Sequence, residues 1–392
     1  MRHRRSLVVT TLLACCLLPG SAWGLIFYST GDINHNTSAP TGPYADSGWQ
    51  WEGAWGVGAG TVVTSKHFIT SNHYSVGGTP PQFYYQGTYY AANTTYHDDP
   101  DSDLRIVEIT GNFTDWAPLN TNTSVKNKDV VVFGRGYTRG DAVVVNSQTK
   151  GWIWSSTGSG TFRWGTNRID DPTTGATYLV LDFDSGGTSE ECIPADRDSG
   201  GGLFVNDGGA WKLAGVTYAA DGVYDTDADH TSGTFKAGLY DEGGLYERIG
   251  TTLWTNYADL PIDQPGTFYA SNVAARRSWI LSAIPELALP LGDMDGSGGV
   301  NNNDITPFVL ALTDRQAYVS QYGYEADILG DIDQSGSLNN NDISPFVALL
   351  TGAGVPASEM ASLNALAVPE PAAIGLITLG GVALLLRRRR SA

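Results

Sequence analysis

The sequence predicts a mainly β protein that ends in a small helical unit and an apolar tail. Between residues 25 and 257 the chain is rich in Gly, Thr, Tyr, Trp and Val, and short apolar runs alternate with turn residues. The runs at 60–69, 129–133 and 178–183 have the length of strands. Strand-length runs separated by Gly, Asn and Asp are typical of a β-sandwich or a β-barrel. A chain of 392 residues is long enough for two or three domains.

The first 24 residues have the pattern of a secretory leader. Three arginines among the first five residues precede an apolar run over 7–18, and Ala22-Trp23-Gly24 offers small residues for a signal peptidase. We therefore expect residues 1–24 to be a signal peptide that is cleaved after Gly24, and the protein to be exported. Lipidation at Cys15 is the alternative.

Charge and cysteine content narrow the setting further. The formal net charge is −18, and an acidic surface repels nucleic acids and anionic lipids. We therefore expect no nucleic-acid partner. Only Cys192 lies outside the leader, so the mature chain has no cysteine partner for a disulfide, and we expect Cys192 to be a buried packing residue.

Three residues have the types and chain order of a nucleophilic catalytic site. Ser199 follows an aspartate and precedes three glycines in the run 196–202. A serine hydroxyl needs a base to accept its proton, and His73 in Thr70-Ser71-Asn72-His73 is the candidate. Asp103 begins an alternating strand over 103–109 and is the candidate to orient the imidazole.

These segments resemble the trypsin-like (chymotrypsin-fold) serine peptidases. The resemblance covers most of residues 50–257. It implies a double β-barrel with the site between the barrels, where Ser199 attacks a peptide carbonyl, His73 acts as base and then acid, and Asp103 orients His73. It also implies an oxyanion hole formed by the backbone N–H groups of Arg197 and Ser199. The segments that carry it are 58–73, 103–109, 197–201, 213–216 and 244–249.

Two residues depart from the family pattern, Arg197 and Asn72, and Asn72 stands where the family has alanine. Arg197 occupies a position where the family has glycine, which adopts unusual dihedral angles freely. The family also pairs a freed N-terminal amine with the aspartate beside the serine, here Asp198, and Leu25 after leader removal is a candidate for that role. The predicted function is an exported serine endopeptidase acting on proteins or peptides. The alternatives are an inactive surface adhesion or scaffold protein and an esterase with the same triad.

The acidic loop that follows the segment 213–216 bears on specificity. By the spacing of the family that the chain resembles, Ile193 lies at the floor of the specificity pocket, which implies a preference for an apolar or small substrate side chain. The alternative is a basic side chain, which a carboxylate from the acidic loop would favour. The acidic residues of this loop are Asp221, Asp225, Asp227 and Asp229.

A repeat with a period of 38 residues predicts two calcium sites. Each copy places oxygen-bearing residues at loop positions 1, 3, 5, 9 and 12, a backbone carbonyl at position 7 and a glycine, Gly298 or Gly336, at position 6. Hard oxygen ligands at this spacing suit Ca²⁺. The predicted ligands are Asp293, Asp295, Ser297, Gly299, Asn301 and Asp304 in the first loop, and Asp331, Asp333, Ser335, Ser337, Asn339 and Asp342 in the second.

A short apolar helix follows each loop, over 305–312 and 343–350. The paired loop-helix units resemble an EF-hand-like type I dockerin module covering residues 291–352. The resemblance implies a cohesin-like partner, with a calcium-stabilised spacer as the alternative. Because two short helices bury little apolar surface, we expect calcium binding to drive folding of this unit.

The C-terminus resembles a PEP-CTERM sorting signal. Val368-Pro369-Glu370-Pro371 precedes an apolar run over 372–386 and four arginines at 387–390. The resemblance implies that residues 369–392 insert transiently into a membrane as a transmembrane sorting helix and are processed by an exosortase, with a plain anchor as the alternative. The expected location is the cell surface or the medium.

The remaining segments complete the predicted organisation. Leu245, Ile249 and Leu253 are spaced four residues apart, which predicts a closing helix at the end of the β region. Residues 258–290 and 353–368 are predicted linkers.

Overall fold

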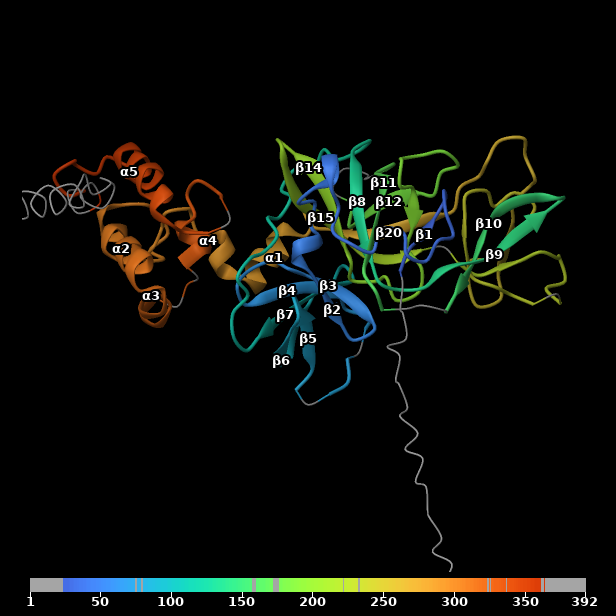
Figure 1. The fold of residues 1–392 in the computed structure, drawn as a ribbon, viewed down its shortest axis with the longest axis horizontal. Helices are drawn as coiled ribbons and strands as arrows, with labels where there is room; N and C mark the ends of the chain where they lie inside the picture. Colours follow the sequence, from blue (N-terminus) through green and yellow to red (C-terminus); the bar gives the residue numbers. More distant parts are fainter. Residues whose placement is uncertain are drawn as a thin grey trace, which may run out of the picture.

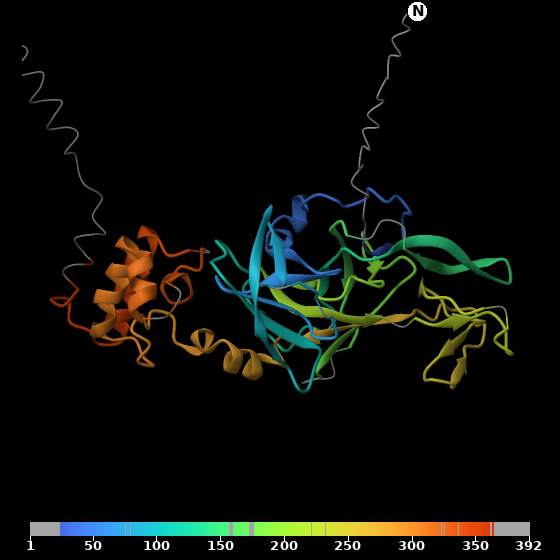
Figure 2. The ribbon, with the colours of Figure 1, turned by 90° about the horizontal axis from the view of Figure 1, so that it is seen from below.

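The computed structural model describes residues 24–360 and Leu363, apart from 75, 79, 157–159, 172–175, 221, 232, 323, 325 and 336. Most of the predicted leader, the second repeat's Gly336 and the predicted transmembrane sorting helix lie outside these residues. The described chain has a β-barrel at its centre, with an open β-sheet beside it. A helical unit lies at one end and a long hairpin at the other (Figures 1 and 2).

The central barrel consists of six antiparallel strands. Strand β2 pairs with both β3 and β5, and β6 and β7 complete the ring through β4. Phe68 and Phe83 stack in its core with ring centroids 4.0 Å apart. In barrel order, the strands are β2 (Glu52–Trp55), β3 (Gly58–Val62), β4 (His67–Ser71), β7 (Leu104–Ile109), β6 (Thr88–Asp98) and β5 (Gln82–Tyr85).

The second set of strands forms an open six-stranded sheet. The prediction of a mainly β fold is confirmed, but the expected second barrel is not closed by backbone pairing of β11 with β12. A side chain joins these edges instead, because Asn167 Nδ2 donates to the Asp182 carbonyl at 2.9 Å. In sheet order, the strands are β11 (Arg163–Arg168), β8 (Asp129–Gly134), β14 (Gly202–Asp207), β15 (Ala210–Ala220), β20 (Thr267–Asn272) and β12 (Tyr178–Asp182).

Two expectations about the end of the β region are wrong. Ile249 and Leu253 lie on no helix; they are 55% and 61% exposed between β18 (Tyr246–Arg248) and β19 (Trp254–Asn256). The expected linker 258–290 contains β20, which lies between β15 and β12. The sheet therefore extends past residue 257, and the helix that follows it is α1 (Arg277–Ala283).

Smaller elements connect these sheets. Strand β1 pairs with β13, and the long hairpin of β9 and β10 pairs with β17. Strand β16 pairs with β18, and β18 with β19. Their bounds are β1 (Ile26–Phe27), β9 (Thr138–Val145), β10 (Gln148–Ser155), β13 (Cys192–Ile193), β16 (Tyr224–Asp225) and β17 (Ala237–Leu239), with short 3₁₀ turns η1 (Gly42–Tyr44), η2 (Trp49–Trp51) and η3 (Pro285–Ala288).

The C-terminal unit contains four helices around its own core. Helices form at both predicted places, and α3 and α4 are additional. Phe308 and Phe346 occupy equivalent positions of the two repeats and stack with ring centroids 4.0 Å apart. The unit consists of η4 (Asn302–Asp304), α2 (Ile305–Thr313), α3 (Arg315–Tyr322), α4 (Ala326–Gly330), η5 (Asn340–Asp342) and α5 (Ile343–Gly352).

Candidate functional site

His73 and Asp103 meet because the strands before and after them are paired. Strand β4 ends at Ser71 opposite Leu104, the first residue of β7, so the residues that flank this pair face each other. His73 Nδ1 lies 2.7 Å from Asp103 Oδ2, and the His73 backbone N–H donates to Asp103 Oδ1 at 3.2 Å. Asp103 is only 6% exposed, so its carboxylate is held on the barrel while the imidazole remains accessible to solvent.

Ser199 lies in a tight turn against the barrel wall. Its carbonyl accepts the Ala59 N–H at 3.1 Å. The next residue, Gly200, has φ +86°, and a Cβ atom there would lie 2.1 Å from the Ala59 carbonyl. Only glycine fits such a position without displacing the barrel strand, so the sequence order serine-glycine is required by the packing.

A single carbonyl links the turn at Ser199 to the strand that leads to His73. The Thr217 carbonyl in β15 accepts the Gly200 N–H at 2.9 Å and the Ser71 hydroxyl at 2.8 Å. Ser71 precedes His73 by two residues and Gly200 follows Ser199. The barrel and the open sheet therefore bring both segments to one place, although no hydrogen bond joins His73 to Ser199 among the described residues.

Tyr74 is a site residue that the sequence reasoning missed. The Tyr74 ring lies 4.6 Å from the His73 ring between centroids, and a Cβ atom at Gly58 would meet both the Tyr74 ring and the Ser199 carbonyl. Burial raises the pKa of Tyr74 to about 12, so its hydroxyl is protonated at neutral pH. Its place directly after the histidine was the only sequence signal.

Arg197 adopts a backbone conformation that glycine favours. Its φ is +75°, in the left-handed region. Its guanidinium lies over the Tyr137 ring, 5.0 Å from the centroid.

Asp198 is a fully buried carboxylate that holds the same turn. Its Oδ1 accepts the Gly136 N–H at 2.6 Å, and its Oδ2 accepts the N–H groups of Ala195 at 2.7 Å and Leu25 at 3.2 Å. Burial raises its pKa to about 7, although these hydrogen bonds oppose the rise. The residue that follows the predicted leader thus lies against the aspartate beside the candidate nucleophile.

The two repeat loops gather three carboxylates each. Oxygens of Asp293, Asp295 and Asp304 lie within 4.8 Å of one another, and the same holds for Asp331, Asp333 and Asp342. Burial raises the pKa of Asp304, and the neighbouring carboxylates of Asp295 and Asp293 raise it further. Mutual repulsion of this kind is relieved when a cation binds between the carboxylates.

The other predicted ligands make hydrogen bonds within each loop. The Ser297 N–H donates to Asp293 at 3.0 Å, and the Asn301 amide donates to the Gly299 carbonyl at 2.9 Å. In the second loop, the Ser335 N–H donates to Asp331 at 2.9 Å, and the Asn339 amide donates to the Ser337 carbonyl at 2.8 Å. Positions 1, 3 and 12 therefore converge, whereas positions 5, 7 and 9 shape the loop.

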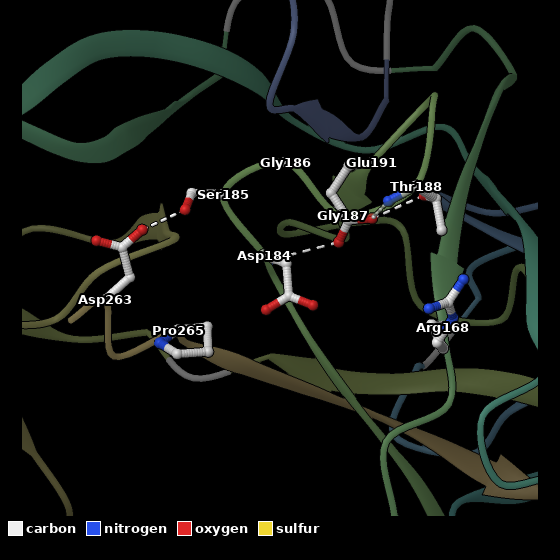
Figure 3. A pocket seen from close by; sticks show the side chains of 9 residues that line it. All are labelled: Arg168, Asp184, Ser185, Gly186, Gly187, Thr188, Glu191, Asp263 and Pro265. Atoms are coloured by element: carbon white, nitrogen blue, oxygen red, sulfur yellow. Dashed lines mark hydrogen bonds between the residues drawn. The ribbon is translucent and has the colours of Figure 1, made fainter.

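A polar pocket of about 340 Å³ is lined by none of the three candidate catalytic residues (Figure 3). Glu191 lies at its wall, where burial raises its pKa to about 7. Its carboxylate accepts the Thr188 N–H at 2.8 Å and the Asp184 N–H at 3.2 Å, so it holds the loop between them. Glu191 at the pocket wall therefore has a structural role in this loop.

Comparison with known proteins identifies the C-terminal segment. A search of curated proteins found no match to the chain. Within the described residues, no helix is both long and apolar enough to cross a membrane. Residues 367–390 match the PEP-CTERM protein-sorting motif. The chain therefore carries the sorting motif of exported proteins that an exosortase-type enzyme processes and that are anchored or sorted at the cell surface through the C-terminus.

Proposed function

We propose that the protein is an exported serine endopeptidase in which Ser199, His73 and Asp103 form the catalytic triad. The observation that carries the proposal is the 2.7 Å contact of His73 with the buried Asp103. Ser71, two residues before His73, and Gly200, directly after Ser199, both donate to the Thr217 carbonyl. The PEP-CTERM motif supports the export that the leader also predicts.

In the proposed reaction, His73 accepts the Ser199 proton as the serine oxygen attacks the substrate carbonyl. The Asp103 contact at Nδ1 leaves Nε2 as the atom that accepts this proton and then delivers it to the leaving amine. The backbone N–H groups of Arg197 and Ser199 stabilise the oxyanion, and loss of one such donor costs about 10²- to 10³-fold in rate. Water then hydrolyses the acyl-enzyme.

Leader removal supplies the last charge of the site. Cleavage after Gly24 converts the Leu25 amide, 3.2 Å from Asp198 Oδ2, into an ammonium group. A buried carboxylate with a raised pKa becomes ionised when a cation is placed beside it. The resulting ion pair fixes the turn that carries Arg197 and Ser199.

The helical unit is proposed to bind two calcium ions. The carboxylates at positions 1, 3 and 12 of each loop would hold the ion, and calcium accepts six to eight oxygen ligands of this type. Calcium would neutralise these carboxylates and fix each loop to the helix that follows it. The unit resembles a dockerin, so a cohesin-like partner or a role as spacer is proposed for it.

Hydrolysis of matched peptide and ester substrates tests this proposal. The mature chain is expected to cleave an unfolded protein, and Ser199→Ala is expected to lower that rate by about 10⁴-fold or more. Ser185→Ala, in the separate polar pocket, is the matched control and keeps the rate. Turnover of esters alone would favour an esterase, and turnover of neither by folded protein would favour the adhesion or scaffold protein.

A further inference from the structure

The acidic loop after β15 gathers a third group of potential metal ligands. Ligand atoms of Asp225, Asp227 and His230 lie within 4.8 Å of one another. This group lies outside both repeat loops and contains none of the candidate catalytic residues. It also differs from the repeat loops in composition, because one of its three ligand atoms is an imidazole nitrogen.

Backbone hydrogen bonds fold this loop back on itself. The Asp227 N–H donates to Asp225 Oδ1 at 3.2 Å, and the Thr231 N–H donates to Asp227 Oδ1 at 3.0 Å. His230 has φ +56°, a left-handed conformation that reverses the chain there. The turn thereby brings the His230 ring back toward the end of β16.

The sheet of β16, β18 and β19 holds two members of this group, Asp225 and His230. Asp225 is fully buried and pairs with Tyr246 of β18. The His230 ring stacks on Trp254 of β19, with centroids 3.9 Å apart and an angle of 14° between the planes. Two of the three ligand-bearing side chains are therefore held by packing before any ion binds.

One of the two imidazole nitrogens of His230 has no hydrogen-bond partner in the described part of the chain. His230 Nδ1 is shielded from solvent and accepts or donates no hydrogen bond among the described residues. A buried polar atom without a partner is unfavourable, and a bound ion is one way to satisfy it.

We propose that Asp225, Asp227 and His230 bind a divalent transition metal ion such as Zn²⁺. Imidazole suits Zn²⁺, whereas Ca²⁺ and Mg²⁺ prefer oxygen ligands, so this site and the repeat loops select different ions. Ligand atoms of a tetrahedral zinc site lie about 3.4 Å apart, so a small contraction of the loop completes the geometry. Water fills the fourth position. The bound ion fastens the 225–231 loop to β19.

Zinc titration of the full mature chain tests this proposal in the presence of excess calcium. We expect one zinc site by isothermal titration calorimetry, together with a change in tryptophan emission because His230 stacks on Trp254. His230→Ala and Asp227→Asn are each expected to weaken this site by at least about 100-fold. His97→Ala is the matched control, since His97 is exposed on β6 of the barrel, which is separate from the sheet of β16, β18 and β19.

Three results would overturn the proposal. They are the absence of zinc binding by the folded chain, an unchanged stoichiometry in His230→Ala, and occupation of the site by calcium in preference to zinc. Far-ultraviolet circular dichroism of each variant verifies that it is folded. Because zinc binding is measured without substrate, its result is independent of whether the protein is a peptidase.

Discussion

At the scale of single residues, the turn at Ser199 contains a strained backbone conformation at Arg197. Arg197 has φ +75°, and a non-glycine residue in this region costs about 1–2 kcal/mol. Contacts elsewhere in the turn offset this cost, above all those of the buried Asp198 with Gly136 and Ala195. The backbone of the turn, rather than the Arg197 side chain, is therefore what the proposed oxyanion hole requires.

Substitutions of Arg197 test this explanation. Arg197→Gly is expected to keep kcat within about threefold, because glycine adopts the same dihedral angles without strain. Arg197→Val is expected to lower kcat by at least about tenfold, because a β-branched residue strongly disfavours positive φ and would move the N–H group. Steady-state kinetics on one peptide substrate measure both. Equal rates for the two variants would contradict the role of this backbone conformation.

Glu52 predicts the pH dependence of stability. It lies between the barrel and the sheet, where Oε1 accepts the Thr61 hydroxyl at 2.7 Å and the Gly202 N–H at 3.3 Å. Burial raises its pKa to about 8, against 4.5 for an ordinary glutamate. A raised pKa in the folded state contributes stability that is present at low pH and is lost as the pH rises through the folded pKa.

Glu52→Gln should therefore flatten the decline in stability toward alkaline pH. Between about pH 5 and about pH 8, the free energy of unfolding of the unmodified chain is expected to fall relative to the variant by up to about 1.4 kcal/mol per pH unit. Urea unfolding of both chains at several pH values measures this difference. Asp198 and Glu191 are present in both chains, so their contributions cancel. Parallel curves would show that Glu52 does not titrate in this range. The exposed Glu359→Gln is the control.

Single residues of the candidate site were predictable where a short motif reflects a backbone conformation or a close contact that only one residue type allows. Gly200 after Ser199 is such a case, since a Cβ atom would meet the barrel wall. Tyr74 was not predictable, because its proximity to Ser199 arises from two segments that are brought together only by the fold. Tyr74 and Ser199 lie far apart along the chain, so a local motif cannot report their proximity.

At the scale of elements, local capping made two helices predictable. Asn301 accepts the Asn303 N–H, and Asp304 accepts the Asn301 N–H, which fixes the start of η4 and α2. The same pattern recurs 38 residues later. By contrast, the spacing of Leu245, Ile249 and Leu253 was misleading, because Gly250 interrupts it. Leu245 packs in a core, whereas Ile249 and Leu253 are exposed.

Calcium dependence tests the element that these loops form. At a calcium concentration about 100 times Kd, binding is expected to stabilise the helical unit by about 2.7 kcal/mol, and chelation is expected to lower its helical signal. Asp342→Asn should reduce this stabilisation, because it removes a charge from the second carboxylate group. Circular dichroism melts with and without chelator measure the effect.

The exposed Glu359→Gln, in the same unit, is the control and should respond to calcium like the unmodified chain. A helical signal that chelation leaves unchanged would contradict the proposed calcium sites.

At the scale of the whole molecule, contacts between distant segments decide the architecture. Strand β20 enters the sheet between β15 and β12, and Leu25 reaches Asp198 across 173 residues of sequence. A sequence pattern reports that a segment is a strand but not which strand it joins, so neither the open sheet nor the position of β20 was predictable. The mainly β class was predictable because it depends on local patterns alone.

In the proposed mechanism, the Leu25 contact would link export to activity. A chain that retains its leader has an amide beside Asp198, whereas the cleaved chain has an ammonium group there. Activity is therefore expected to require an N-terminus at Leu25, and the PEP-CTERM motif then directs the exported chain to the cell surface. The order of these steps would keep the proposed peptidase inactive before export.

The most direct test of the central claim is intact-mass measurement after treatment with a fluorophosphonate. The mature chain beginning at Leu25 is expected to gain one label on Ser199, and the label is expected to be absent in Ser199→Ala and strongly slowed in His73→Ala. The chain that retains its leader should react more slowly than the mature chain. A folded mature chain that takes up no label, or one that takes it up equally in Ser199→Ala, would contradict the assignment of Ser199 as the nucleophile.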